Sequence, residues 1–300
     1  MGNIHFTNEV LFKNFKQLEV EVVSNQNAVW LYFNSQPRSC FTQTLLDELD
    51  KFQSILKQHA GKLPCNGKLV DINFNVITSR HHVFSFGGDL DFFVRCITEK
   101  NENALRNYAR SCIDAVYYNY IGRELGLTTI SLVHGNALGG GFEAALSSHV
   151  LIAEENAEMG FPEILFNLFP GMGAFNLLLN RVNPSTAKKM MMNGCKYDAR
   201  ELFDMGIVDI LVNEGEGKLA VDAFIQTNRK RNNAITAITK ATQLSNTLDY
   251  QKLLEIGDLW VDTAFRICEK DLRIMNRLIN SQDKIATQVN ESPFVSATAY

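Results

Sequence analysis

Three consecutive glycines, Gly139 to Gly141, constrain the fold of this chain more than any other sequence feature. They follow the apolar run Thr129 to His134, which is predicted to be a short buried strand, and they lead into a predicted helix from Gly141 to His149. Fixing a glycine costs more backbone entropy than fixing any other residue. Three of them between a strand and a helix therefore indicate an α/β protein in which something approaches this turn closely.

The periodicities on either side of this turn predict repeated β-β-α units. The first strands form an antiparallel hairpin, and further strands and helices alternate after it. The expected elements are strands at Leu18–Val23, Ala28–Phe33, Leu69–Phe74 and Val150–Ala153, and helices at Thr42–Gln58 and Glu102–Leu125. From about Glu216 onward only helical patterns remain. We expect a spiral α/β core over residues 1–215, an all-helical region over 216–290 and a tail over 291–300.

Composition excludes several classes of function. The chain has 300 residues, 46% of them hydrophobic, and a net charge of -4 without a dense basic stripe, so nucleic acid is not an expected partner. No apolar run approaches the roughly 18 residues of a membrane span, and the N-terminus lacks an apolar leader, so we expect no membrane insertion and a cytoplasmic location. No Cys-x-x-Cys pair or HExxH spacing occurs, so neither a metal nor another cofactor is expected.

The glycine turn carries a carboxylate. Glu143 follows Gly140 by three residues, close to one helical turn, so its side chain can lie near the N–H groups that the glycines expose. It is the only charged residue between Ala137 and Leu146. Apolar surroundings raise the pKa of a carboxyl group, which suits proton transfer near neutral pH. A solvated surface glutamate is the alternative.

Two further segments have the same character. Gly87 and Gly88 lie between a predicted strand and an apolar helical run, where a turn can direct backbone N–H groups at a ligand. Glu163 lies in the apolar segment FPEIL, just after a proline. A plain tight turn is the alternative for the glycines, and a glutamate that stabilises a helix dipole is the alternative for Glu163.

Together these segments resemble the crotonase (enoyl-CoA hydratase/isomerase) superfamily. In that family one oxyanion N–H comes from a glycine turn before Asp-Leu, and the other comes from a GGG-x-E turn. The resemblance implies a crotonase-like spiral fold, an oxyanion hole made by the N–H groups of Gly88 and Gly140, and an acid/base pair made by Glu143 and Glu163. Which glutamate is the acid and which the base stays open.

The amino-acid sequences of four motifs resemble the bacterial diffusible signal factor (DSF) synthases more closely. The motifs are FGGDLDFF, HGNALGGGFEAALS, EMGFPEILFNLFPGMGA and LWVDTAFRICEKDLRIMNRL. This resemblance implies a dehydratase and thioesterase that converts 3-hydroxyacyl-ACP to a cis-2-enoyl product and releases a free unsaturated fatty acid, a quorum-sensing signal. It also implies that Gly87, Leu138, Met172, Trp260 and Leu278 contact the substrate. Core packing explains the four larger side chains equally well.

The same resemblance implies several partners. They are an acyl carrier protein bearing the 3-hydroxyacyl chain, a receiver domain of a sensor kinase, and further copies of the chain in a homotrimer or another homo-oligomer. Arg95, Lys100, Arg106 and Arg110 are candidates for docking the acidic carrier protein from one predicted helical stretch. Two other functions remain as alternatives, a plain enoyl-CoA hydratase/isomerase and a non-catalytic relative of the same fold.

Overall fold

A six-stranded sheet forms the centre of the molecule. The computed structural model describes residues 11–290, and the predicted tail over 291–300 lies outside them. The strands follow the order β1-β2-β5-β6-β8-β11, in which β1 is antiparallel to β2 and all other neighbours are parallel. Their bounds are β1 Leu18–Val23, β2 Ala28–Phe33, β5 Phe74–Ser79, β6 Thr128–Val133, β8 Val150–Glu154 and β11 Ile210–Val212. The predicted opening hairpin is confirmed, with Val20 opposite Leu31.

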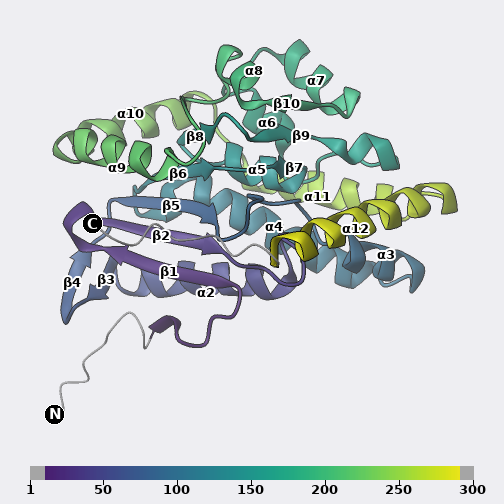
Figure 1. Cartoon of the computed structure of the whole chain (residues 1–300), viewed down its shortest axis with the longest axis horizontal. Coiled ribbons are helices and arrows are strands. Elements are labelled where there is room, and N and C mark those ends of the chain that lie inside the picture. Colours follow the sequence, from purple (N-terminus) through teal and green to yellow (C-terminus); the bar gives the residue numbers. More distant parts are fainter. Residues whose placement is uncertain (1–10, 291–300) are drawn as a thin grey trace.

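Helices cover both faces of this sheet (Figure 1). Those of the first part of the chain are α2 (Gln43–Gln58), α3 (Leu90–Thr98), α4 (Glu102–Tyr120), α5 (Gly140–Leu146), α6 (Ala174–Leu178), α7 (Pro184–Asn193) and α8 (Ala199–Asp204). The predicted helix over 42–58 is confirmed with its first residue at Gln43, and the Thr42 side chain caps it by accepting from the Leu45 N–H. The predicted helix from Glu102 ends at Tyr120, where a 3₁₀ turn η2 (Gly122–Glu124) follows.

One predicted strand is wrong in its bounds. The run Leu69–Phe74 divides between β4 (Lys68–Asp71), which pairs with β3 (Lys62–Cys65), and β5, which begins at Phe74. Between them the Ile72 N–H donates to Gly61 and the Asn73 N–H donates to Asn27. The backbone partners change within this run, and sequence periodicity does not report the partners of a strand.

A small second sheet lies beside the glycine turn. It has the order β10-β9-β7, with β7 Ala137–Leu138, β9 Glu158–Gly160 and β10 Lys196–Asp198. Strand β7 runs parallel to β9, with Leu138 opposite Gly160. This backbone pairing brings the segment that carries Glu143 close to the segment that carries Glu163.

Only helices occur among the described residues after β11. They are α9 (Gly217–Asn228), α10 (Asn232–Ser245), α11 (Tyr250–Ala264) and α12 (Glu269–Asn290), with a 3₁₀ turn η4 (Arg229–Arg231). Helix α11 packs on α4, and α12 packs on α3 and on the 3₁₀ helix η3 (Pro162–Phe166) (Figure 1). Helix α10 has no buried residue. No helix among residues 11–290 combines the length and the apolar character that a membrane crossing requires.

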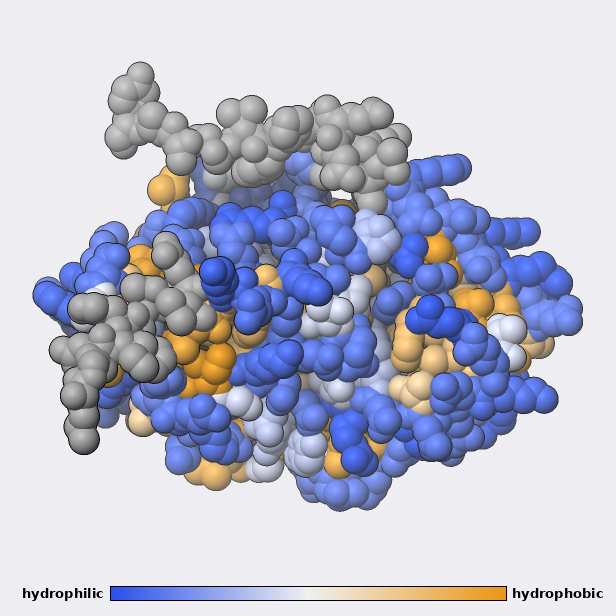
Figure 2. Space-filling view, turned by 90° about the horizontal axis from the view of Figure 1, so that it is seen from below, coloured by the Kyte–Doolittle hydropathy of each residue, from blue (hydrophilic) through white to orange (hydrophobic). Residues whose placement is uncertain are grey.

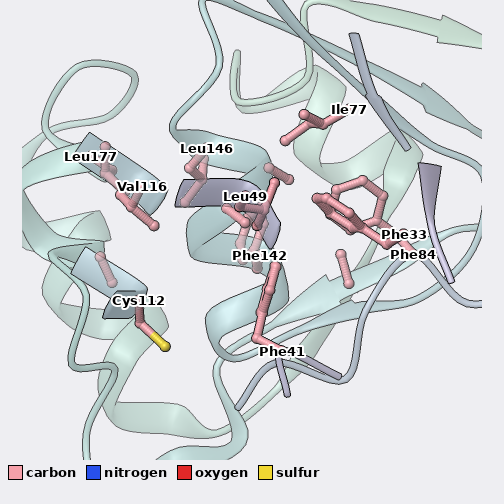
Figure 3. Close-up of a cluster of buried hydrophobic side chains, with 14 of the residues drawn as sticks. Phe33, Phe41, Leu49, Ile77, Phe84, Cys112, Val116, Phe142, Leu146 and Leu177 are labelled. Atoms are coloured by element: carbon pink, nitrogen blue, oxygen red, sulfur yellow. The ribbon is translucent and has the colours of Figure 1, made fainter. Parts of the chain in front are cut away.

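The hydrophobic core has two compartments separated by the sheet. The larger one packs α2, α4 and α5 against one face, and Figure 3 shows Leu49, Val116 and Phe142 of these three helices together. The smaller one packs Val221 and Ile225 of α9 against the other face. Each large apolar side chain buried in this way contributes about 1.5–3 kcal/mol. The face seen from below is mainly hydrophilic, with hydrophobic residues in separate patches (Figure 2).

Candidate active site

The Gly88 turn leaves one backbone N–H without an acceptor. Among four consecutive residues, the Phe86 N–H donates to the Ser39 carbonyl (2.7 Å), the Gly87 N–H to Ser85 Oγ (3.1 Å) and the Asp89 N–H to the Tyr108 hydroxyl (3.0 Å). The N–H of Gly88 has no acceptor among the described residues. Gly88 is half-buried, so this unpaired N–H is available to a ligand.

The Gly140 turn lies against the Gly88 turn. Leu138 donates its N–H to the Ser85 carbonyl (2.9 Å), which ties the two segments together. A Cβ atom added to Gly140 would lie 3.5 Å from the Gly88 nitrogen. Gly140 is the first residue of α5, where a helix has no internal acceptor for its N–H groups. Two free N–H groups therefore come from neighbouring turns.

Gly87 and Gly139 explain why these turns need glycine. Gly87 has φ +89°, and a Cβ there would lie 2.7 Å from the Leu138 carbonyl oxygen and 2.8 Å from the Gly140 nitrogen. Gly139 has φ +56°, and a Cβ there would lie 2.4 Å from Glu163 Oε1. Both positions combine a left-handed backbone with a close neighbour, so only glycine fits.

Glu143 is a buried carboxylate with two fixed donors. Its side chain leaves α5, whose residues are all buried, and Oε1 accepts from the Met172 N–H (2.8 Å) and from the Ala174 N–H (2.9 Å). Burial raises the pKa of Glu143 from 4.5 to about 7, and the two N–H donors oppose part of that rise. The group therefore titrates near neutral pH.

Glu163 is less well paired. It lies in η3, is 9% exposed, and its Oε2 is buried without a hydrogen-bond partner among the described residues. Burial, followed by the negative charge of Glu143, raises the pKa of Glu163 from 4.5 to about 8. The carboxyl groups of Glu143 and Glu163 therefore have different environments, and the pKa of Glu163 is raised further.

One cavity of about 260 Å³ brings these groups together. Its lining includes Gly88, Gly140, Glu143 and Glu163, together with the four predicted substrate contacts Leu138, Met172, Trp260 and Leu278. Gly87 has a different place from the predicted one, because it does not line the cavity but packs between the two turns. The turns, the carboxyl groups and an apolar wall thus share one cavity.

Several lining residues were not predicted from the sequence. They include Phe93 of α3, Tyr108 and Cys112 of α4, Lys196 of β10 and Gln282 of α12. Tyr108 and Cys112 are four residues apart and belong to the apolar face of α4, which was the available signal. Nothing local distinguishes the part of that face that meets the cavity from the part that meets the core.

The predicted basic docking stretch is wrong as a single helix. Arg95 belongs to α3, while Arg106 and Arg110 belong to α4. The two helices are separated at Lys100, which has φ +55°. Arg106 is paired with Glu102, Asp258 and Asp262. A helix pattern read across Lys100 and Asn101 misses this break because the asparagine caps a new helix there. Within residues 11–290 no cluster of three or more His, Cys, Asp or Glu could hold a metal ion.

The family now follows from comparison with known proteins. A family model described as enoyl-CoA hydratase/isomerase matches residues 71–258, more than half of the chain. The chain belongs to the enoyl-CoA hydratase/isomerase family. The matched residues include both glycine turns and both glutamates, so this family membership and the geometry of the cavity concern the same part of the molecule.

Curated members of the family are similar over part of the chain. A protein of Arabidopsis thaliana described as probable mitochondrial enoyl-CoA hydratase 2 is 36% identical over 146 residues, 45% of this chain and 48% of that protein. A probable enoyl-CoA hydratase of Bacillus subtilis is 23% identical over 191 residues, 64% of this chain and 68% of that protein. The matched region thus spans about half the length of the plant relative.

Solved structures of other proteins share the fold. Enoyl-CoA hydratase from Bacillus halodurans superimposes with a TM-score of 0.73 at 16% identity, covering 88% of this chain and 100% of that one. DspI from Pseudomonas aeruginosa superimposes with a TM-score of 0.62 at 24% identity, covering 82% and 94%. These likenesses concern the fold alone and confirm the predicted crotonase-like α/β class.

Proposed function

We propose that the chain catalyses the reversible addition of water to the C2=C3 double bond of a 2-enoyl thioester. The observation that carries this proposal is the juxtaposition of two buried carboxyl groups of unequal pKa with two free N–H groups in one cavity. Hydration needs one group that takes a proton from water, one that gives a proton to carbon, and donors for the enolate oxygen.

The N–H groups of Gly88 and Gly140 bind the thioester carbonyl oxygen. Attack of water at C3 moves negative charge onto that oxygen as an enolate, so the two hydrogen bonds are stronger in the transition state than in the bound substrate. Each donor of this kind contributes about 3–4 kcal/mol to transition-state stabilisation. Gly140 heads α5, and the positive end of the helix dipole acts in the same direction.

The hydrogen bonding of the two carboxyl groups supports an assignment of the roles that the sequence left open. Glu143 accepts two backbone N–H hydrogen bonds, which favour its ionised form, so it removes a proton from the attacking water. Glu163 Oε2 is buried without a hydrogen-bond partner among the described residues, which favours the protonated form, so Glu163 delivers a proton to C2 as the enolate collapses. In the reverse direction Glu163 takes the proton from C2, and Glu143 gives a proton to the departing hydroxyl group.

A second candidate function is the DSF-type reaction, dehydration of a 3-hydroxyacyl chain on an acyl carrier protein followed by hydrolysis of the thioester. The observation that favours it is the place of the motif LWVDTAFRICEKDLRIMNRL, which supplies Trp260 and Leu278 to the cavity. Hydrolysis would use the same oxyanion hole, with a glutamate activating water. This second candidate includes four further proposals. They are docking of the carrier protein, restraint by a receiver domain, assembly into a homotrimer and a cytoplasmic location.

One experiment tests both candidates. The purified chain is incubated with 2-enoyl-CoA thioesters of several lengths and, separately, with 3-hydroxyacyl carrier protein of about twelve carbons, and the products are identified by mass spectrometry. Formation of 3-hydroxyacyl-CoA without free acid supports the hydratase. Release of free cis-2-enoic acid from the carrier protein supports the second candidate.

The control is the protein with both Glu143→Ala and Glu163→Ala. Turnover that persists in this variant would show that the products arise elsewhere. Turnover of neither substrate by the wild-type protein would refute both candidates.

A further inference from the structure

We propose that Tyr108 is a positioning residue whose hydroxyl group aims the Gly88 N–H into the cavity. This inference rests on the proposed function, because it concerns the oxyanion donor named there. Tyr108 belongs to α4, is 2% exposed, and lies under the Gly88 turn with its ring packed edge-on against Phe93 at 5.2 Å.

The hydroxyl group of Tyr108 joins two backbone segments. It accepts a hydrogen bond from the Asp89 N–H (3.0 Å), directly after Gly88, and donates one to the Phe41 carbonyl (2.5 Å). Phe41 in turn donates its own N–H to the Gly87 carbonyl (2.8 Å). These bonds form a closed ring that runs from Tyr108 through Phe41 and Gly87 to Asp89 and back to Tyr108.

The planarity of the peptide bond makes this ring directional. The Gly87 carbonyl and the Gly88 N–H belong to one trans peptide unit, so they point in opposite directions. Because the carbonyl is held toward Phe41, the N–H of Gly88 must point away from Phe41, and Gly88 lines the cavity. The Asp89 N–H, fixed on Tyr108, holds the following peptide unit as well. The ring therefore fixes the peptide units on both sides of Gly88, and with them the direction of the Gly88 N–H.

The outer side of the same turn is held by Arg38. Its guanidinium group lies 3.8 Å from Asp89 Oδ1 and 3.5 Å from Asp91 Oδ2, and it donates to Asp283 of α12 at 2.8 Å. This clamp reaches the turn through charged side chains, whereas Tyr108 reaches it through the backbone. The hydroxyl of Tyr108 has both its donor and its acceptor roles occupied, and burial raises its pKa well above 10, so it is not the proton donor of the reaction.

The test compares Tyr108→Phe with the matched control Tyr120→Phe. Tyr120 also lies on α4, is 8% exposed and donates its hydroxyl to a backbone carbonyl, that of Asn246 at 3.1 Å, but it does not line the cavity. Both variants lose one buried hydroxyl group and keep the ring. Steady-state hydration of 2-enoyl-CoA gives kcat and KM. The carbonyl stretching frequency of bound hexanoyl-CoA, which is saturated and cannot be hydrated, reports the oxyanion donors without turnover.

For Tyr108→Phe we expect kcat to fall by about tenfold to a hundredfold with KM changed less than about twofold, because a misplaced donor weakens the transition state more than the ground state. The carbonyl stretch should move back toward its value in water. Tyr120→Phe should change neither. Wild-type kcat and an unchanged carbonyl stretch in folded Tyr108→Phe would overturn the inference.

Two outcomes separate this inference from the proposed function. If the wild-type protein shifts the carbonyl stretch of hexanoyl-CoA but hydrates nothing, the proposed function fails while the comparison of the two variants still stands. If Tyr108→Phe does not fold, hydrogen-exchange mass spectrometry on the wild-type protein replaces it. Exchange of the peptide over 86–91 at the rate of an unstructured turn would then contradict the ring.

Discussion

The two walls of the cavity differ in origin and in character. The core wall comes from the Gly88 turn, α5 and η3, and it carries Gly88, Gly140, Glu143 and Glu163. The helical wall comes from α11 and α12 and contributes Trp260, Leu278 and Gln282. The first holds polar groups at fixed backbone positions, and the second is mainly apolar. In the proposed function the first wall carries the reacting groups, and the second wall contacts the acyl chain.

The separation between the walls is not complete. The Trp260 side chain packs on Gly171 so closely that a Cβ there would lie 2.6 Å from the indole Cδ1. The next residue, Met172, donates its N–H to Glu143. The helical wall therefore supports one of the carboxylates of the core wall. Helix α10 differs from α11 and α12, because it has no buried residue and does not line the cavity.

The largest effect is expected from the core wall. Glu143→Ala and Glu163→Ala should each lower kcat for hydration by about a thousandfold at every acyl length, because each removes a proton-transfer group. Glu154→Gln is the matched control: this buried glutamate accepts from the Gly215 and Gly217 N–H groups, away from the cavity. It should lower stability and leave kcat unchanged. Circular dichroism checks folding, and near-normal activity in either alanine variant would remove that residue from the site.

The next effect tests the link between the walls. Trp260→Ala should lower kcat/KM by about tenfold to a hundredfold, because the Gly171–Met172 backbone loses its support and the Glu143 carboxylate moves. Trp260→Phe should recover much of this loss, since a ring still covers Gly171. Trp30→Phe, on the other face of the sheet, serves as the control. An equal loss in Trp30→Phe would mean that the effect is one of general stability.

The effect of pH on activity is expected to be smaller. It should reflect the ionisation of Glu143 and Glu163 together. Activity needs Glu143 ionised and Glu163 protonated, and their pKa values are about 7 and about 8. Below about pH 7 the base is lost by protonation, and above about pH 8 the acid is lost by ionisation. The profile of kcat/KM should therefore be bell-shaped, falling about tenfold per pH unit on each side. A flat profile between pH 5 and 9 would contradict these roles.

The smallest effect is expected from Leu278 on the helical wall. Leu278→Ala should lower kcat/KM a few-fold for long acyl chains only, because loss of about one buried CH₂ of contact with the chain removes about 0.8 kcal/mol. Short substrates should be turned over as before. Leu259→Ala, which changes a leucine of α11 that is 53% exposed, is the control. A loss that is the same at every chain length would place Leu278 in the support of the catalytic groups rather than in the acyl pocket.

Much of the site was predictable from local sequence. The three glycines, the spacing from Gly140 to Glu143 and the isolated carboxyl of Glu163 are local signals, and each of them lies where a ligand could meet free N–H groups. The predicted hairpin and the helix over 43–58 are likewise local patterns that the structure retains. Such features survive folding because a glycine with positive φ or an N-cap satisfies its constraint within a few residues.

The tertiary structure alone decided what those local features do together. It brought the Gly88 nitrogen beside Gly140, left Glu163 Oε2 unpaired, placed Trp260 on Gly171 and closed the ring through Tyr108 and Phe41. It also divided the apolar run Leu69–Phe74 between two sheets. Each of these outcomes depends on partners far apart in the chain. Local periodicity fixes which face of an element is apolar, and only packing chooses between the core, the cavity and another strand as its neighbour.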